Sequence, residues 1–229
     1  TGWRKEANGA RDYHIGFVQW DGSTWVKHPT PVLPGTHPWE RMQGHSLVGD
    51  QAVFYEPGPG NQPGTWHLWY NANSDTAVVI GHATSRDGID WPAKERQAIR
   101  HSSWPHAGPA TPSGPYHMDV LFRNGAYLFL GWMASPQQPA RQGLWYSKVL
   151  SADGKAPGSF AVWHPLIYEL NGVTWHDSGP ATSASHQTGL FGATLEQDGQ
   201  TAWLFYHGVR LEGSYPFASI GRARVDDLP

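Results

Sequence analysis

The stretch that decides the fold runs from residue 80 to residue 91 and reads Ile80-Gly81-His82-Ala83-Thr84-Ser85-Arg86-Asp87-Gly88-Ile89-Asp90-Trp91. An Asp-Gly pair between two extended segments is a strong β-hairpin pattern, because Gly adopts positive φ and Asp bonds back to the amides of the turn. Trp91, three residues after the Gly, offers a large flat surface to bury against a neighbouring unit. The stretch therefore predicts a strand, a tight turn and an anchoring aromatic residue.

This pattern repeats along the chain. Similar segments begin at Ile15 and, more weakly, at Leu144, and the three Asp-Gly pairs start at residues 21, 87 and 153, with a constant spacing of 66. The first residues of a fourth copy of this pattern begin at Ile220, and the sequence ends at Pro229. Each turn follows a predicted hairpin, and the paired segments are 53–55 with 66–70, 120–122 with 127–130, and 193–195 with 203–206. One repeat thus holds four antiparallel strands, as a β-propeller blade does.

We therefore expect an all-β protein that forms a single β-propeller domain over residues 1–229. The expected divisions are a partial blade at 1–36 and blades at 37–100, 101–170 and 171–229, about three and a half blades in all. A propeller must close on itself or leave sheet edges open to aggregation. We expect an upstream segment or a partner chain to complete the ring, and favour the segment. The alternative is a β-sandwich with turns spaced by chance.

Composition narrows the classes of function. Only 15% of the residues are charged, while Trp (13), Gly (27) and Pro (19) are abundant, which suits short strands and tight turns. The net charge of −3 gives no electrostatic basis for binding nucleic acid or an anionic membrane. No apolar run approaches the ~20 residues that cross a bilayer, and the chain has no Cys for disulfides or Cys-ligated metals. An extracellular or periplasmic location is expected, although the cytoplasm is also compatible.

The repeats resemble a known superfamily. Blades ending in Ile-Gly-x-Ala-x-Ser-x-Asp-Gly-x-x-Trp are typical of the five-bladed propellers of glycoside hydrolase families 32, 43 and 68, and residues 80–91 match every fixed position. Residues 38–40 (Pro-Trp-Glu) resemble the approach to the third blade, and residues 175–179 (Trp-His-Asp-Ser-Gly) resemble the last blade. The resemblance implies a five-bladed ring, and it makes Glu40 the general acid. It also implies that the family's nucleophile or base, and its transition-state-tuning Asp, lie upstream of Thr1.

The repeat itself indicates where a site would form. The innermost strands of a propeller run the same way along the axis, so their leading ends converge on one mouth. Glycosidic bond cleavage needs two carboxyl groups that flank the bond, and the candidates near these ends are Glu40, Asp50 and Asp119. Each has a structural alternative: Glu40 as a surface residue bonded to Arg41 or to a loop amide, Asp50 as a bulge former beside Gly49, and Asp119 as a hydrogen-bonded carboxylate in an apolar strand.

Other residues near the mouth are expected to bind saccharide by stacking or hydrogen bonding. They are Trp39, His45, Trp104, Tyr116, His117, Trp132, Asp177 and His186. No metal ligands or cofactor are expected, with a structural Ca²⁺ or other ion in the central channel left open. The Pro-, Gly- and Ser-rich segment 101–116 is predicted to overhang the mouth, since long loops often carry function.

The leading hypothesis is a glycoside hydrolase that cleaves glycosidic bonds in a poly- or oligosaccharide by acid/base chemistry between paired carboxyl groups. The alternative is a non-catalytic carbohydrate-binding or scaffold propeller. A third class, a polysaccharide lyase or a phosphorylase, needs a different base or a basic phosphate pocket, and no Arg/Lys cluster favours the phosphorylase.

Overall fold

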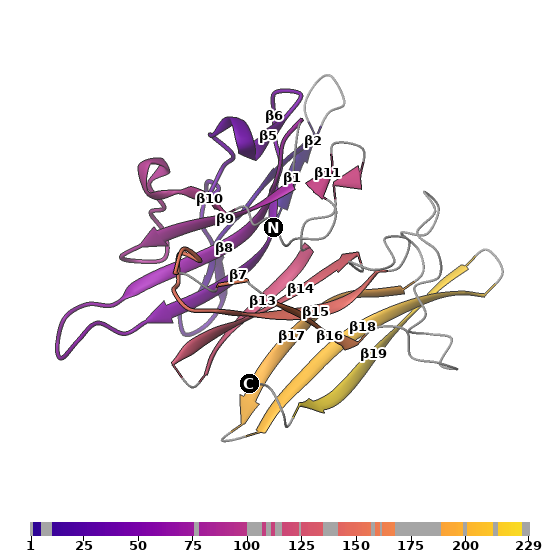
Figure 1. Ribbon diagram of the computed structural model, residues 1–229. Helices are drawn as coiled ribbons and strands as arrows, with labels where there is room; N and C mark the ends of the chain where they lie inside the picture. Colours follow the sequence, from indigo (N-terminus) through magenta and orange to yellow (C-terminus); the bar gives the residue numbers. More distant parts are fainter. Residues whose placement is uncertain are drawn as a thin grey trace. The chain divides into compact units, whose positions relative to one another are not determined.

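The computed structural model forms two compact units, Thr1–Arg100 with Gly108–Pro112, and His101–Ala107 with Ser113–Pro229 (Figure 1). The residues that the structure describes are 2–5, 11–75, 78–99, 107–108, 111–112, 116–123, 125–134, 142–156, 159–160, 162–167, 189–198, 201–212 and 215–225. Within these residues the chain is all-β, with no α-helix, and no helix is long and apolar enough to span a membrane.

The first unit contains a complete four-stranded antiparallel sheet in the order β10-β9-β8-β7. Its strands are β7 (Val48–Glu56), β8 (Thr65–Asn73), β9 (Val78–Ser85) and β10 (Gln97–Ile99). Strand, hairpin, strand, connection, strand, Asp-Gly turn and strand follow one another as the repeat predicts. All four strands lie within the segment 37–100 that the sequence marks as one blade.

Three smaller hairpins precede and flank this sheet in the first unit. They pair β1 (Gly2–Lys5) with β2 (Arg11–His14), β3 (Val18–Trp20) with β4 (Trp25–Lys27), and β5 (Arg41–Met42) with β6 (His45–Ser46). Two single-turn 3₁₀ helices, η1 (Pro38–Glu40) and η2 (Ala93–Glu95), lie in the connections before β5 and before β10.

One face of the four-stranded sheet forms the core of the first unit. Successive side chains of a strand point to opposite faces, so Leu68, Tyr70 and Ala72 of β8 share this face, and all three are buried. The rest of the cluster comes from neighbouring strands and connections: Ile15, Leu33, Val48, Val79, Ala83 and Trp91. Trp91, which follows the Asp-Gly turn, is therefore buried as predicted, but mainly among residues of its own sheet rather than against a neighbouring unit. The burial predicted for the Trp after the turn fails at Trp25, which is exposed.

The second unit contains two antiparallel sheets built from consecutive strands. One has β13 (Tyr116–Arg123), β14 (Ala126–Ala134), β15 (Gln142–Val149) and β16 (Trp163–Ile167), and the other has β17 (Gly189–Asp198), β18 (Thr201–Glu212) and β19 (Tyr215–Val225). Two short strands, β11 (Ala107–Gly108) and β12 (Thr111–Pro112), precede them in the chain. The single propeller domain, the count of five blades and the closure of the ring stay predictions.

The Asp-Gly turns form as the sequence predicts, but only the turn at Asp21 directly closes a hairpin, between Trp20 and Trp25. At Asp87 and Asp153 the paired strands are joined by longer connections, from His82 to Gln97 and from Ser147 to Trp163. The Oδ1 atoms of Asp21 and Asp87 each accept two backbone N–H bonds of 2.8 Å, from the residues two and three positions later. Asp153 Oδ1 accepts the N–H of Lys155 at 3.0 Å. The glycines at 22, 88 and 154 all have positive φ, at 103°, 76° and 69°. Asp21, Asp87 and Asp153 are confirmed as turn formers.

Candidate functional site at the leading ends of the first strands

The first strands of both four-stranded sheets carry a β-bulge near their leading ends. In the first unit the register runs from Gly49 opposite Asn71 to Ala52 opposite Trp69, so β7 holds one more residue than β8 over this interval. The second unit repeats the irregularity in β13, where the pair of Tyr116 with Trp132 is followed by Asp119 opposite Leu130. Each interval has one extra residue on the first strand.

The last described sheet has the same feature. Along β17 the register runs from Phe191 opposite His207 to Ala193 opposite Tyr206, which again adds one residue to the first strand. Bulges are over-represented next to active sites, where they re-aim a side chain. Each of the three larger described sheets therefore has a bulge in its first strand, in β7, β13 and β17. Each bulge lies near the leading end of the strand, where the sequence predicts the opening of the propeller.

Asp50 lies within the first of these bulges. Its φ of 46° is in the left-handed region, which few residues other than Gly adopt and which Asp and Asn tolerate best. The side chain is half-buried. The predicted bulge at Asp50 is confirmed, and this backbone conformation, being costly for most side chains, is the kind found at functional sites. Aligning the strands places His117 at the corresponding position of β13.

Asp119 follows the second bulge and is half-buried. Its Oδ1 accepts the N–H of Val120 at 2.8 Å, so this carboxylate has the hydrogen bond that its apolar strand demands. Asp50 belongs to the first unit and Asp119 to the second, and their convergence stays a prediction.

Glu40 ends the short helix η1 and has no exposed surface. Its Oε2 accepts the backbone N–H groups of Thr36 and His37 at 2.6 and 2.9 Å, and its Oε1 accepts the hydroxyl of Tyr70 at 2.6 Å. Of the structural alternative, the surface position is wrong, whereas the hydrogen bonds to loop amides are confirmed. In this conformation no substrate can reach the carboxyl group, so its role as general acid stays a prediction that the geometry does not favour.

Arg96 completes this buried group. Its Nη1 lies 3.5 Å from Glu40 Oε2 and donates to the carbonyl of Pro34 at 2.8 Å. Nε and Nη2 both donate to the carbonyl of Trp91, at 3.1 and 2.8 Å. Burial, and then the charge of Glu40, raise the pKa of the Tyr70 hydroxyl far above its ordinary value, so it remains a donor. The cluster joins the approach to β7 with the end of the Asp87 turn.

Trp39 and His45 lie beside the Glu40 cluster. The ring of Trp39 stacks between His37, at 5.3 Å between centroids, and Tyr70, at 6.1 Å. His45 Nδ1 lies 3.5 Å from Asp12 Oδ1 in a partly exposed position. Trp39 therefore packs against the blade, and neither residue's predicted contact with saccharide is tested by these positions.

The remaining predicted residues are only partly described. Tyr116 and Trp132 are register partners on β13 and β14, and His117 lies in the bulge between them and the next pair. Trp104, Asp177 and His186 lie outside the described residues, as does most of the segment 101–116 that is predicted to overhang the mouth. Among the residues with defined placement, no three His, Asp or Glu side chains are grouped as metal ligands would be.

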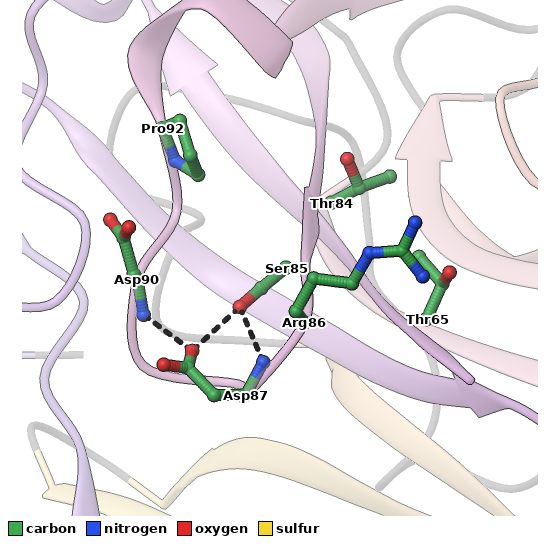
Figure 2. Close-up of a pocket in the computed structure, with 7 residues that line it drawn as sticks. All are labelled: Thr65, Thr84, Ser85, Arg86, Asp87, Asp90 and Pro92. Carbon is green, nitrogen blue, oxygen red and sulfur yellow. Dashed lines mark hydrogen bonds between the residues drawn. The ribbon is translucent and has the colours of Figure 1, made fainter. Parts of the chain in front are cut away.

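A polar pocket of about 420 Å³ lies at the opposite end of the four-stranded sheet of the first unit (Figure 2). The leading end of β7 pairs with the end of β8, whereas Glu56 at its trailing end pairs with Thr65. The pocket lies on this trailing side and is lined by Thr65, Thr84, Ser85, Arg86, Asp87, Asp90 and Pro92. Sequence reasoning missed it, because Arg86 and Asp90 occupy variable positions of the repeat. A comparison of the three repeats could have found the pocket, because only the repeat at Asp87 has charged residues at these two positions.

Comparisons with known proteins bear on the fold. No protein-family model matches the sequence, and no curated protein is similar to it in sequence. Among solved structures, a glycosyl hydrolase from Bacteroides ovatus is 15% identical, with a TM-score of 0.61 over 98% of this chain and 62% of its own. A thermostable family-43 glycoside hydrolase is 14% identical, with a TM-score of 0.54 over 96% of this chain and 65% of its own. An exo-1,5-α-L-arabinanase from a bovine ruminal metagenomic library is 14% identical, with a TM-score of 0.51 over 91% and 63%.

This chain spans a little under two thirds of the length of these three structures. At such low identity the likeness shows the fold alone. Over the residues that align, the chain has the fold of propeller glycoside hydrolases, which confirms the resemblance that residues 80–91 indicate and supports a propeller over a β-sandwich.

Proposed function

We propose that this protein cleaves glycosidic bonds in a poly- or oligosaccharide, with a site at the leading ends of its first strands. The observation that carries the proposal is the bulge that recurs in β7, β13 and β17 within a fold shared with glycoside hydrolases. A bulge in one strand has many explanations. The same bulge in three sheets points to a feature that serves the common mouth of a propeller.

Asp50 and Asp119 take the roles of the paired carboxyl groups in this proposal. In glycosidic bond cleavage one carboxyl group donates a proton to the leaving oxygen, while the second acts as base or nucleophile. Glu40 is a positioning residue: through Tyr70 and Arg96 it holds the segment that leads into β7.

The test is hydrolysis of a panel of aryl glycosides and oligosaccharides by wild type, Asp50→Asn and Asp119→Asn. Each substitution should lower kcat by about 10²- to 10⁴-fold, the usual contribution of a general acid or base. Asn tolerates the left-handed backbone of residue 50, and at position 119 its side-chain oxygen can still accept the N–H of Val120, so both variants should fold.

The matched control is Glu196→Gln, which removes an exposed carboxylate from the first strand β17, well beyond its bulge. Its rate should equal that of wild type. Unchanged kcat in both Asp variants, with thermal unfolding showing that they are folded, would remove the proposed mechanism.

A second candidate function is a carbohydrate-binding propeller without chemistry of its own. The observation that favours it is the burial of Glu40, which leaves that predicted acid no access to a substrate. Saturable binding of an oligosaccharide that wild type does not hydrolyse would select this alternative.

A further inference from the structure

The pocket at the trailing end of the first unit's four-stranded sheet lies over a turn whose backbone is held by hydrogen bonds. Ser85 Oγ accepts the N–H groups of Asp87 and Gly88 at 3.2 and 2.9 Å and donates to Asp87 Oδ1 at 3.0 Å. Asp87 Oδ1 in turn accepts the N–H groups of Ile89 and Asp90. These bonds hold the backbone of the turn, so the side chains that project from it start from a defined position.

Two charged side chains project from this turn. Figure 2 shows Arg86 extending toward Thr65 and Thr84, and Asp90 on the other side of the turn, near Pro92. Both residues are exposed. In the part of the chain that the structure describes, neither charged group has a hydrogen bond or an ion pair. The pocket therefore presents a cationic donor and an anionic acceptor with free bonding capacity.

The other repeats show that the turn does not need these charges. The positions of Arg86 and Asp90 correspond to Trp20 and Thr24 in the turn at Asp21. In the turn at Asp153 they correspond to two alanines, at 152 and 156. The Asp side chain bonds to turn amides in all three. Arg86 and Asp90 thus add something that the architecture of the repeat does not require.

We propose that this pocket is a second saccharide-binding site, which takes a neutral sugar unit at the end of the blade opposite Asp50. A carboxylate accepts hydrogen bonds from adjacent hydroxyls, and a guanidinium donates to them in a fixed fork. The two Asp residues outnumber the one Arg in the lining, which disfavours uronate, sulfate or phosphate groups. The volume lies within the range of small-ligand sites, roughly 300–1,000 Å³.

Only the choice of a saccharide as the ligand rests on the proposed function. A protein that cleaves a polysaccharide gains affinity by binding the same polymer at a second site. It contributes binding and no chemistry. Its residues lie at the far end of β8 and β9 from the bulge that holds Asp50.

The test is a ¹H–¹⁵N NMR titration of the full chain, on an Asp50→Asn background, with xylotriose, arabinotriose, cellotriose and the anionic trigalacturonate. At least one neutral trisaccharide should shift the amides of residues 84–91 saturably, and trigalacturonate should bind more weakly. Arg86→Gln and Asp90→Asn should each raise Kd about tenfold, as expected for the loss of hydrogen bonds to a charged group. Lys155→Gln, in the corresponding turn at Asp153, is the control and should leave Kd unchanged.

The absence of saturable shifts at residues 84–91 with every neutral probe would overturn the proposal, as would an unchanged Kd in the Arg86→Gln, Asp90→Asn double variant. Tighter binding of trigalacturonate would overturn the neutral class of ligand. Hydrolysis reports separately on the proposed function. If the shifts are saturable but wild type hydrolyses no substrate of the panel, the binding site is supported and the catalytic proposal is wrong. If wild type hydrolyses a substrate but no shifts occur at residues 84–91, the catalytic proposal is supported and the binding site is wrong.

Discussion

The turns at Asp21 and Asp87 share an Asp-Gly pair followed by Trp and two backbone hydrogen bonds to the Asp side chain, yet the Trp after one turn is buried and the Trp after the other is exposed. Trp91 is 4% exposed and belongs to the core of its blade, whereas Trp25 is 66% exposed. In both turns the Asp accepts two backbone N–H bonds of the same length, 2.8 Å. The local sequence therefore determines the turn, whereas tertiary packing determines whether the Trp that follows it is buried.

The surroundings of the two Trp residues explain the difference. Trp91 Nε1 donates to the carbonyl of Gly88 at 3.0 Å, and its own carbonyl accepts two bonds from Arg96. Trp25 lies on the two-stranded β3–β4 hairpin, where its ring meets Trp20 at 5.6 Å between centroids. Trp91 is buried because the four-stranded sheet and the segment that contains Arg96 surround it. The two-stranded β3–β4 hairpin leaves Trp25 exposed.

The largest expected effect is on stability when each Trp is truncated. Trp91→Ala should lower the free energy of unfolding by about 3–5 kcal/mol, because it removes a large side chain from a packed core. Trp25→Ala should change it by no more than about 0.5 kcal/mol, as at other exposed positions. Urea denaturation followed by fluorescence and circular dichroism measures both. Equal losses would mean that the Asp21 turn is anchored as firmly as the Asp87 turn.

A smaller effect is expected at two glycines that occupy the same position of the repeat. A Cβ added at Gly81 would lie 2.2 Å from the buried ring of Tyr70, whereas one added at Gly16 meets nothing within 4 Å. Gly81→Ala should therefore destabilise the protein by about 1–3 kcal/mol through overpacking. Gly16→Ala should stay within about 0.5 kcal/mol of wild type. Thermal unfolding of the two variants tests the pair, and a neutral Gly81→Ala would show that the Tyr70 ring moves freely.

The local parts of this architecture could be read from the sequence. Asp-Gly followed by Trp predicted the turns and the order of the strands, because both depend on neighbouring residues. The bulge at Asp50 was foreseen from Gly49 as an alternative role. Its recurrence at residue 117 was not foreseen, because a bulge is defined by pairing with a second strand, and register depends on contacts that no single segment contains.

The surroundings of Glu40 could not be read in this way. Pro38-Trp39-Glu40 is a short, turn-like stretch with a single charged residue, yet the carboxylate of that residue is fully buried. Its partners Tyr70 and Arg96 lie 30 and 56 residues later in the chain, so only the tertiary fold brings them together. Arg86 and Asp90 were overlooked for the opposite reason: they sit in a recognised motif, at positions that the motif leaves variable.

The smallest expected effect concerns acid stability at the two turns. Backbone N–H bonds, chiefly from Asp90 and Ile89, lower the pKa of Asp87 below its ordinary value of 3.8, and those from Thr24 and Ser23 do the same for Asp21. Because the folded pKa is the lower one, each carboxylate stabilises the fold above about pH 3.8 and loses that contribution as the pH falls through its folded pKa. Asp87→Asn should therefore flatten the fall of unfolding free energy between pH 5 and pH 2.

Asp21→Asn should flatten this fall less, because the β3–β4 hairpin lacks the anchor of the blade and can open without global unfolding. Denaturation of wild type and both variants across this pH range measures the difference, and both effects should be small because the two carboxylates are exposed. NMR titration supplies the control, since both Asp residues should titrate below pH 3.8 in wild type. If Asp21→Asn flattened the profile as much as Asp87→Asn, the two turns would be equally coupled to global unfolding, and the exposure of Trp25 would have no energetic consequence.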